Sequence, residues 1–70
     1  MKDELNIYMK AKVEACVELS SGPLEFRHNV QRVTGLTHSG FLGSPFLRQI
    51  QNDMEDGLTD REIVQLYFGV

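Results

Sequence analysis

Hydrophobic residues recur along residues 3–20 with the period of an α-helix. At about 100° per residue, one side of this helix carries Leu5, Met9, Val13, Cys16 and Val17, flanked by Tyr8, Ala11, Ala15 and Leu19. A narrow polar strip holds Asp3, Lys10, Glu14 and Glu18. The apolar arc covers more than half of the helix, which exceeds what an edge helix needs. We expect central packing among other helices; the alternative is a second copy or another partner packed against it.

Glycine and proline divide the rest of the chain into helix-sized pieces. Gly22 and Pro23 separate the first helix from a second one, which we expect over residues 23–33. Gly35 supplies the exit from this helix. Residues 37–42 could form a short further helix, although the glycines within and after this segment disfavour it.

A further helix is predicted to begin where Ser44 precedes Pro45, because serine is a preferred N-cap and proline is preferred in the first turn. Its apolar face carries Leu47, Ile50 and Met54. Gly57 closes this helix, so its predicted length is about three turns.

The last helix has the clearest local motif in the chain. Thr59 and Glu62 match a capping box, and Leu58 and Ile63 stand at the positions of a hydrophobic staple. The helix is therefore predicted to begin at Asp60. It runs apolar to the terminus through Val64, Leu66, Tyr67 and Phe68. We expect these side chains to dock on the first helix or to form part of an interface.

These elements predict an all-α fold, a single domain over residues 1–70 with four to five helices and short turns marked by glycine and proline. The alternating pattern of a β-strand is not sustained in any segment. A chain of 70 residues has a thin core, and its single cysteine cannot form an internal disulfide. Self-association is therefore the expected source of added stability.

The sequence offers few groups for catalysis or metal binding. Its one cysteine and two histidines stand in separate segments, at Cys16, His28 and His38, without the spacing of a zinc site. The acidic stretch around Gly57 fails as a calcium loop, because that register puts Met54 and Ile63 at ligand positions. Phosphate-binding glycine motifs do not occur. We expect no enzymatic activity, no cofactor and no metal.

A lone thiol in an apolar run suits a reducing compartment. The N-terminus has no apolar leader region, and the longest uncharged stretch is too short and too rich in glycine to span a bilayer. These features predict a cytoplasmic protein without a membrane partner. Chains of this size without an enzymatic site are common products of phages and plasmids.

Charge is unevenly distributed along the chain, which has a net charge of -3. Residues 51–70 hold five acids against Arg61, whereas residues 24–50 are mildly basic. This favours a regulator that binds another protein with a basic surface, in the manner of an inhibitor or antirepressor. The predicted contact residues are Phe41, Leu42, Phe46 and Arg48 near the glycine-rich loop, and Asp53, Glu55 and Asp56 in the acidic segment. The alternative that both phenylalanines simply close the core stays open.

Self-association is expected to use the surplus apolar surface of the first and last helices. The predicted homodimer contacts are Tyr8, Val17, Tyr67 and Phe68. All four are large or branched apolar side chains, the kind that protein interfaces bury.

The alternative function is DNA binding by a helix-turn-helix motif around Gly35. In that interpretation Thr37, His38 and Ser39 face bases, while Arg27 and Arg32 contact phosphates. Three features weaken it: Gln31 stands where the turn needs a small residue, glycine and proline interrupt the second helix, and acids outnumber bases.

Overall fold

The computed structural model describes residues 6–69 of the chain. This part contains five α-helices joined by short turns. They are α1 (Ile7–Leu19), α2 (Pro23–Thr34), α3 (His38–Leu42), α4 (Pro45–Glu55) and α5 (Asp60–Phe68). The predicted all-α fold is confirmed. The short helix that residues 37–42 could form is present as α3, although the glycines disfavoured it. Within these residues, no helix has the length and apolar character needed to cross a membrane.

Four of the five helices begin at a residue whose side chain accepts a hydrogen bond from the first turn. The caps and distances are Asn6 to the Met9 N–H at 2.8 Å, Thr37 to Gly40 at 3.0 Å, Ser44 to Leu47 at 3.3 Å and Thr59 to Glu62 at 3.2 Å. The Glu62 carboxylate also accepts from the Thr59 N–H at 2.9 Å, so the predicted capping box is confirmed. These four helix starts are therefore fixed by local hydrogen bonds, whereas α2 begins at Pro23 after Gly22, without a side-chain cap.

The predicted start of the first helix is wrong. Asn6 is extended, with φ −74° and ψ 176°, and α1 begins after it. The Asn6 side chain competes for the backbone N–H that a longer helix would use, which is why asparagine favours caps over helix interiors. Residues 3–5, predicted to be helical, lie outside the described residues.

Gly35 ends α2, and Gly57 follows the end of α4, both as predicted. Their φ angles are +76° and +100°, a region that side chains disfavour and glycine adopts readily. Gly69, with φ +74°, caps α5, whereas the apolar pattern predicted that this helix continues to the terminus. The left-handed glycine cap ended the helix despite that pattern.

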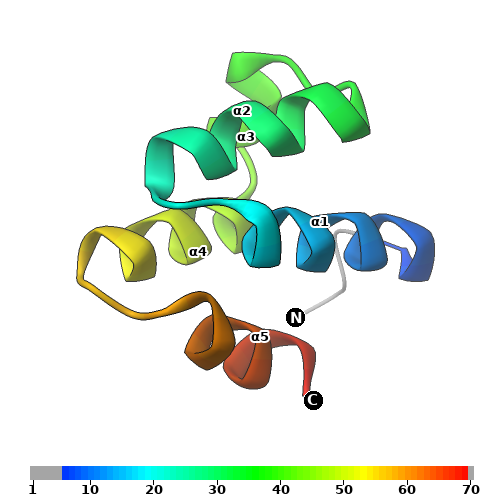
Figure 1. Cartoon of the computed structure of the whole chain (residues 1–70). Coiled ribbons are helices and arrows are strands. Elements are labelled where there is room, and N and C mark those ends of the chain that lie inside the picture. Colours follow the sequence, from blue (N-terminus) through cyan, green and yellow to red (C-terminus); the bar gives the residue numbers. More distant parts are fainter. Residues whose placement is uncertain (1–5, 70) are drawn as a thin grey trace.

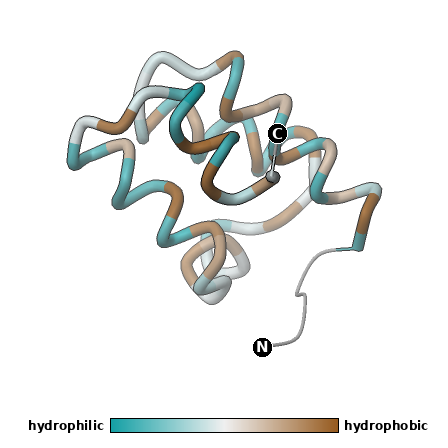
Figure 2. Tube along the Cα trace, turned by 90° about the horizontal axis from the view of Figure 1, so that it is seen from below, coloured by the Kyte–Doolittle hydropathy of each residue, from teal (hydrophilic) through white to brown (hydrophobic). Residues whose placement is uncertain are grey.

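The four longer helices form a closed ring, in which α1 contacts α2, α2 contacts α4, α4 contacts α5 and α5 contacts α1. The short helix α3 contacts α2 and α4 (Figure 1). The buried core draws on all five helices: Val13, Cys16, Val17, Phe26, Val30, Phe41, Leu47, Ile50, Ile63 and Val64. Hydrophobic positions accordingly recur along every helix, with α5 nearest the viewer in Figure 2. The expected contact of α5 with α1 is confirmed, whereas Leu66 is 63% exposed and both Tyr67 and Phe68 pack against Phe46 of α4.

Candidate protein-binding surfaces

The helix α1 is apolar on two opposite sides, and only one of them is covered. Its inner side is buried at Val13, Cys16 and Val17. On its outer side Ile7, Tyr8 and Leu19 are 86%, 66% and 77% exposed. Ala11 and Ala15 are exposed as well. The expected central packing is therefore only half realised: α1 lies between α2 and α5, but its outer side faces solvent.

We call the five exposed apolar residues Ile7, Tyr8, Ala11, Ala15 and Leu19 the outward face of α1. Ile7 and Leu19 are contact candidates that were not predicted, and only Leu19 belonged to the predicted apolar arc. Tyr8 was predicted as a dimer contact, and the structure places it on this face. The Lys12 ammonium lies 4.5 Å from the centre of the Tyr8 ring and donates to the Val33 carbonyl at 3.1 Å. The ammonium therefore covers one face of the Tyr8 ring.

Val17, also predicted as a dimer contact, is completely buried. It is nine residues from Tyr8, which at about 100° per residue places the two side chains on opposite sides of the helix. Val17 therefore cannot contact another molecule in this fold, and this prediction is wrong.

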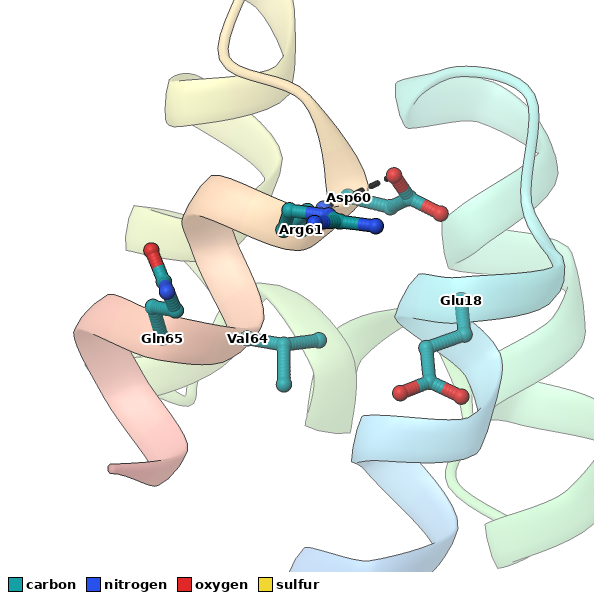
Figure 3. Close-up of a pocket in the computed structure, with 5 residues that line it drawn as sticks. All are labelled: Glu18, Asp60, Arg61, Val64 and Gln65. Atoms are coloured by element: carbon teal, nitrogen blue, oxygen red, sulfur yellow. Dashed lines mark hydrogen bonds between the residues drawn. The ribbon is translucent and has the colours of Figure 1, made fainter. Parts of the chain in front are cut away.

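Along the seam between α1 and α5 lies an open cleft of about 550 Å³. Glu18 lines it from α1, and α5 contributes Asp60, Arg61, Val64 and Gln65 (Figure 3). Val64 points from α5 towards α1, and the Asp60 carboxylate accepts a hydrogen bond from the Arg61 backbone N–H at 2.7 Å. Its two carboxylates, Glu18 and Asp60, are both exposed to solvent. An open hollow with mixed charges suits contact with another side chain better than a reaction that requires exclusion of water.

A smaller hollow lies at the other end of the same seam. It is lined by Ile7, Lys10, Ala11, Glu14 and Phe68. Because Phe68 at the end of α5 lies beside the start of α1, and Asp60 beside the end of α1, the two helices are antiparallel. Lys10, Glu14 and Glu18 therefore share the edge of α1 that faces α5.

The glycine-rich segment does not present both of its phenylalanines. Phe41 is completely buried and its ring packs edge-on against Phe26, with ring centres 5.9 Å apart. Its predicted role as a partner contact is wrong, because α3 turns this side chain into the core. Leu42 and Arg48 are exposed and stay candidate contacts.

Phe46 belongs to a partly buried aromatic cluster with Tyr67 and Phe68. Its ring centre lies 5.9 Å from each of theirs, in edge-on geometry. The Tyr67 hydroxyl donates to the Asp53 carboxylate, and burial together with this bond raises the Tyr67 pKa to about 12. Tyr67 and Phe68, predicted as dimer contacts, thus place much of their surface against their own chain.

Five acids surround the turn between α4 and α5, and we call this surface the acidic corner: Asp53, Glu55, Asp56, Asp60 and Glu62. Asp60 and Glu62 lie in the first turn of α5, where the helix dipole favours them. The other three lie at the C-terminal end of α4, which has no basic residue in its last turn. Negative charge is unfavourable there, since the helix end is itself negative.

Two of these three carboxylates have neutral partners on α4. Gln49 donates to Asp53 at 3.2 Å and Gln51 donates to Glu55 at 3.4 Å. Amide donors stabilise a carboxylate but leave its charge in place. The acidic corner therefore keeps a negative field towards solvent.

The segment predicted for DNA binding does form helix, turn and helix. The backbone of Gly35 is in the left-handed region, and Thr37 caps the start of α3. His38 and Ser39 are exposed in the first turn of α3. However, α3 is only 5 residues long, and Phe41 near its end belongs to the core.

The residues predicted to support such a motif also have other roles. Arg27 is partly buried, and Arg32 is exposed but donates to the Asn29 side chain at 3.1 Å. The Gln31 side-chain nitrogen is buried without a hydrogen-bond partner. Gln31, which the sequence marked as too large for the turn, therefore carries an energetic cost in this position.

Cys16 packs in the core as a small apolar residue. Burial raises the pKa of its thiol, and the nearby Arg32 charge partly opposes this effect. A protonated, buried thiol is unreactive. His28 and His38 are exposed on α2 and α3.

Comparison of the chain with known protein families, with curated proteins and with solved structures finds no match.

Proposed function

We propose that this chain is a non-enzymatic regulator that binds another protein with a basic surface. The observation that supports the proposal is the placement of Asp53, Glu55 and Asp56 at the C-terminal end of α4. Each carboxylate at a helix C-terminus costs roughly 0.3–1 kcal/mol. Residues that work against local stability are expected at functional sites.

A basic partner would offset this cost. Lysine or arginine side chains facing the acidic corner would neutralise the three carboxylates and the end of α4 together, and complementary charge also accelerates association. Suitable partners are a DNA-binding regulator or a nucleic-acid-processing enzyme, whose phosphate-binding surface the acidic corner would block. Leu42 and Arg48 are exposed elsewhere on α3 and α4 and could extend the contact. The proposed compartment is the cytoplasm.

Self-association is part of the proposal, because a domain of this size gains stability from a second copy. A dimer would present two acidic corners. Two linked sites bind a multivalent or symmetric partner more tightly than either site does separately.

The second candidate function is DNA binding through α2 and α3. The left-handed Gly35 and the capped start of α3 favour it, since they expose His38 and Ser39 beside a turn. A recognition helix of 5 residues offers little surface to a major groove, and the acidic charge opposes approach to DNA. We therefore rank this function second.

A protein-capture assay and a DNA-binding assay distinguish the two candidate functions. The tagged protein is used to capture proteins from a bacterial lysate at low and at high salt, and its Glu55→Gln/Asp56→Asn variant is tested beside it. We expect the wild type to enrich proteins with basic surfaces, with less capture in the variant and at high salt. The variant Glu25→Gln removes a carboxylate from α2, outside the acidic corner, and should capture as the wild type does.

Equal capture by all three proteins would contradict the proposed function. A salt-sensitive shift of a DNA duplex by the wild type, lost in Arg32→Ala, would favour the second candidate instead.

A further inference from the structure

We propose that a second copy of this chain covers the outward face of α1, with the two α1 helices antiparallel across a twofold axis. The inference rests on the self-association included in the proposed function, and it assigns that association to one face and one geometry. It does not involve the acidic corner.

The outward face has the properties of a surface that is covered in the working molecule. A helix that is apolar on opposite sides is typical of one with neighbours on both sides, and α2 and α5 cover only the inner part of α1. Ile7 and Leu19 lie about 18 Å apart along the helix, at 1.5 Å per residue. Large exposed side chains over that length make a patch that monomers seldom leave in water.

Four of the five side chains on this face are placed symmetrically about the level of Val13, whereas Tyr8 has Glu18 at the equivalent position. Ile7 and Leu19 each lie six residues from Val13, and Ala11 and Ala15 each lie two residues from it. A twofold axis that passes the outward face at the height of Val13 along the helix therefore brings Ala11 opposite the partner's Ala15, and Ile7 opposite the partner's Leu19. Small side chains near the axis allow the helices to approach closely, while large ones fill the ends.

The charges on the edge of α1 that faces α5 fit the same arrangement. Lys10, Glu14 and Glu18 follow one another along that edge. A twofold axis across antiparallel helices brings the same edge of each copy together. Lys10 then lies between the partner's Glu14 and the partner's Glu18, within about one turn of each. Both copies form these contacts, so opposite charges alternate along the shared edge.

A parallel pair would lack this complementarity. Parallel helices related by a twofold axis bring opposite edges together, so that Lys10 would face the edge that carries Lys12. Lys12 lies on the α2 side of the helix, where it donates to the Val33 carbonyl. The antiparallel pair also brings the two Lys12 side chains to one edge, but each of them donates to its own Val33 carbonyl. Only the antiparallel geometry adds the attraction between Lys10 and two glutamates of the partner, and we therefore favour it.

Charge exchange tests the geometry directly. Lys10→Glu and Glu18→Lys are made as single variants, and association is measured by sedimentation equilibrium up to tens of micromolar. Each variant should associate on the order of tenfold more weakly than the wild type, because like charges meet on both sides of the axis. An equimolar mixture should regain association as a heterodimer, since the acidic edge of one variant then faces the basic edge of the other.

The apolar part of the face is tested with Ala15→Glu, which places a charge near the axis. Ala15 is exposed, so the helical circular dichroism should stay unchanged while the protein becomes monomeric. Leu66→Glu is the matched control, because Leu66 is 63% exposed on α5, outside the proposed contact. The variant Glu55→Gln/Asp56→Asn should dimerise as the wild type does. The test of the dimer is therefore independent of whether the acidic corner binds a basic partner.

Three results would overturn the inference. They are a wild-type chain that stays monomeric at tens of micromolar, an Ala15→Glu variant that still dimerises, and a mixture of the two charge variants that does not regain association. A monomeric wild type whose partner capture is lost in Ala15→Glu would assign the face to a different protein.

Discussion

The two sides of α1 carry similar side chains in opposite surroundings. Val13 and Val17 on the inner side are completely buried, while Ile7 and Leu19 on the outer side lie mostly in solvent. Hydrophobicity therefore does not determine which side is buried. The neighbours α2 and α5 determine it, and the side they leave uncovered is the better candidate for contact with another molecule.

The strongest test of this contrast introduces one charge on each side. Val17→Asp buries a carboxylate without a partner, which should cost several kcal/mol and leave the domain largely unfolded. Leu19→Asp places the same group in solvent at the C-terminal end of α1, so it should lower the free energy of unfolding of the monomer by no more than about 1 kcal/mol. Circular dichroism in a urea titration measures both. Similar losses in the two variants would contradict the assignment of the sides.

A second contrast is between the neighbours Phe41 and Leu42. Phe41→Ala should destabilise the domain by about 3–5 kcal/mol, because it removes a completely buried ring and leaves a cavity beside Phe26. Leu42→Ala, at a position that is 41% exposed, should cost far less. The midpoint of chemical unfolding reports the difference. If Phe41→Ala unfolds at the wild-type midpoint, Phe41 is not a core residue.

Tyr67 is partly buried, between the fully buried and the exposed residues compared above. Ionisation of its hydroxyl lowers the stability of the fold only at high pH. Its pKa is about 12 in the folded chain against 10.0 for the free group, so the folded state favours the protonated hydroxyl. The resulting stability is fully present below pH 10 and is lost as the pH rises from 10 to 12. Over this range the melting temperature of the wild type should fall faster than that of Tyr67→Phe.

The matched control for this measurement is Tyr8→Phe. Tyr8 is exposed, and its replacement leaves the bond between Tyr67 and Asp53 in place. The melting temperature of Tyr8→Phe should therefore follow the wild-type pH profile. If Tyr67→Phe also follows that profile, the Tyr67 hydroxyl is not held in its protonated form by the fold.

Helix positions were predictable wherever they depend on a few adjacent residues. Thr59 with Glu62, and Gly35 after α2, act through local hydrogen bonds and backbone preference, so the sequence contains all that is needed. Asn6 acts in the same local way, but it lies within an apolar run that suggested an earlier helix start. The cap was readable from the sequence, and the longer periodic pattern obscured it.

The candidate surfaces were less predictable because they depend on how the helices cross. Periodicity gives the angle between Tyr8 and Val17, which already excludes a shared interface, but it does not say which of them is buried. The direction of Phe41 depends on how α3 packs against α2 and α4. The acidic corner, in contrast, lies within one stretch of sequence, and its position was predicted.

The closure of the helix ring by α1 and α5 has a consequence for synthesis of the chain. A ribosome adds about 5–20 residues per second, so α1 is complete a few seconds before α5 can join it. During that interval α1 lacks its α5 neighbour, and its outward face is uncovered as well. A helix of 13 residues is only marginally stable alone, so α1 reaches its full stability only when α5 closes the ring.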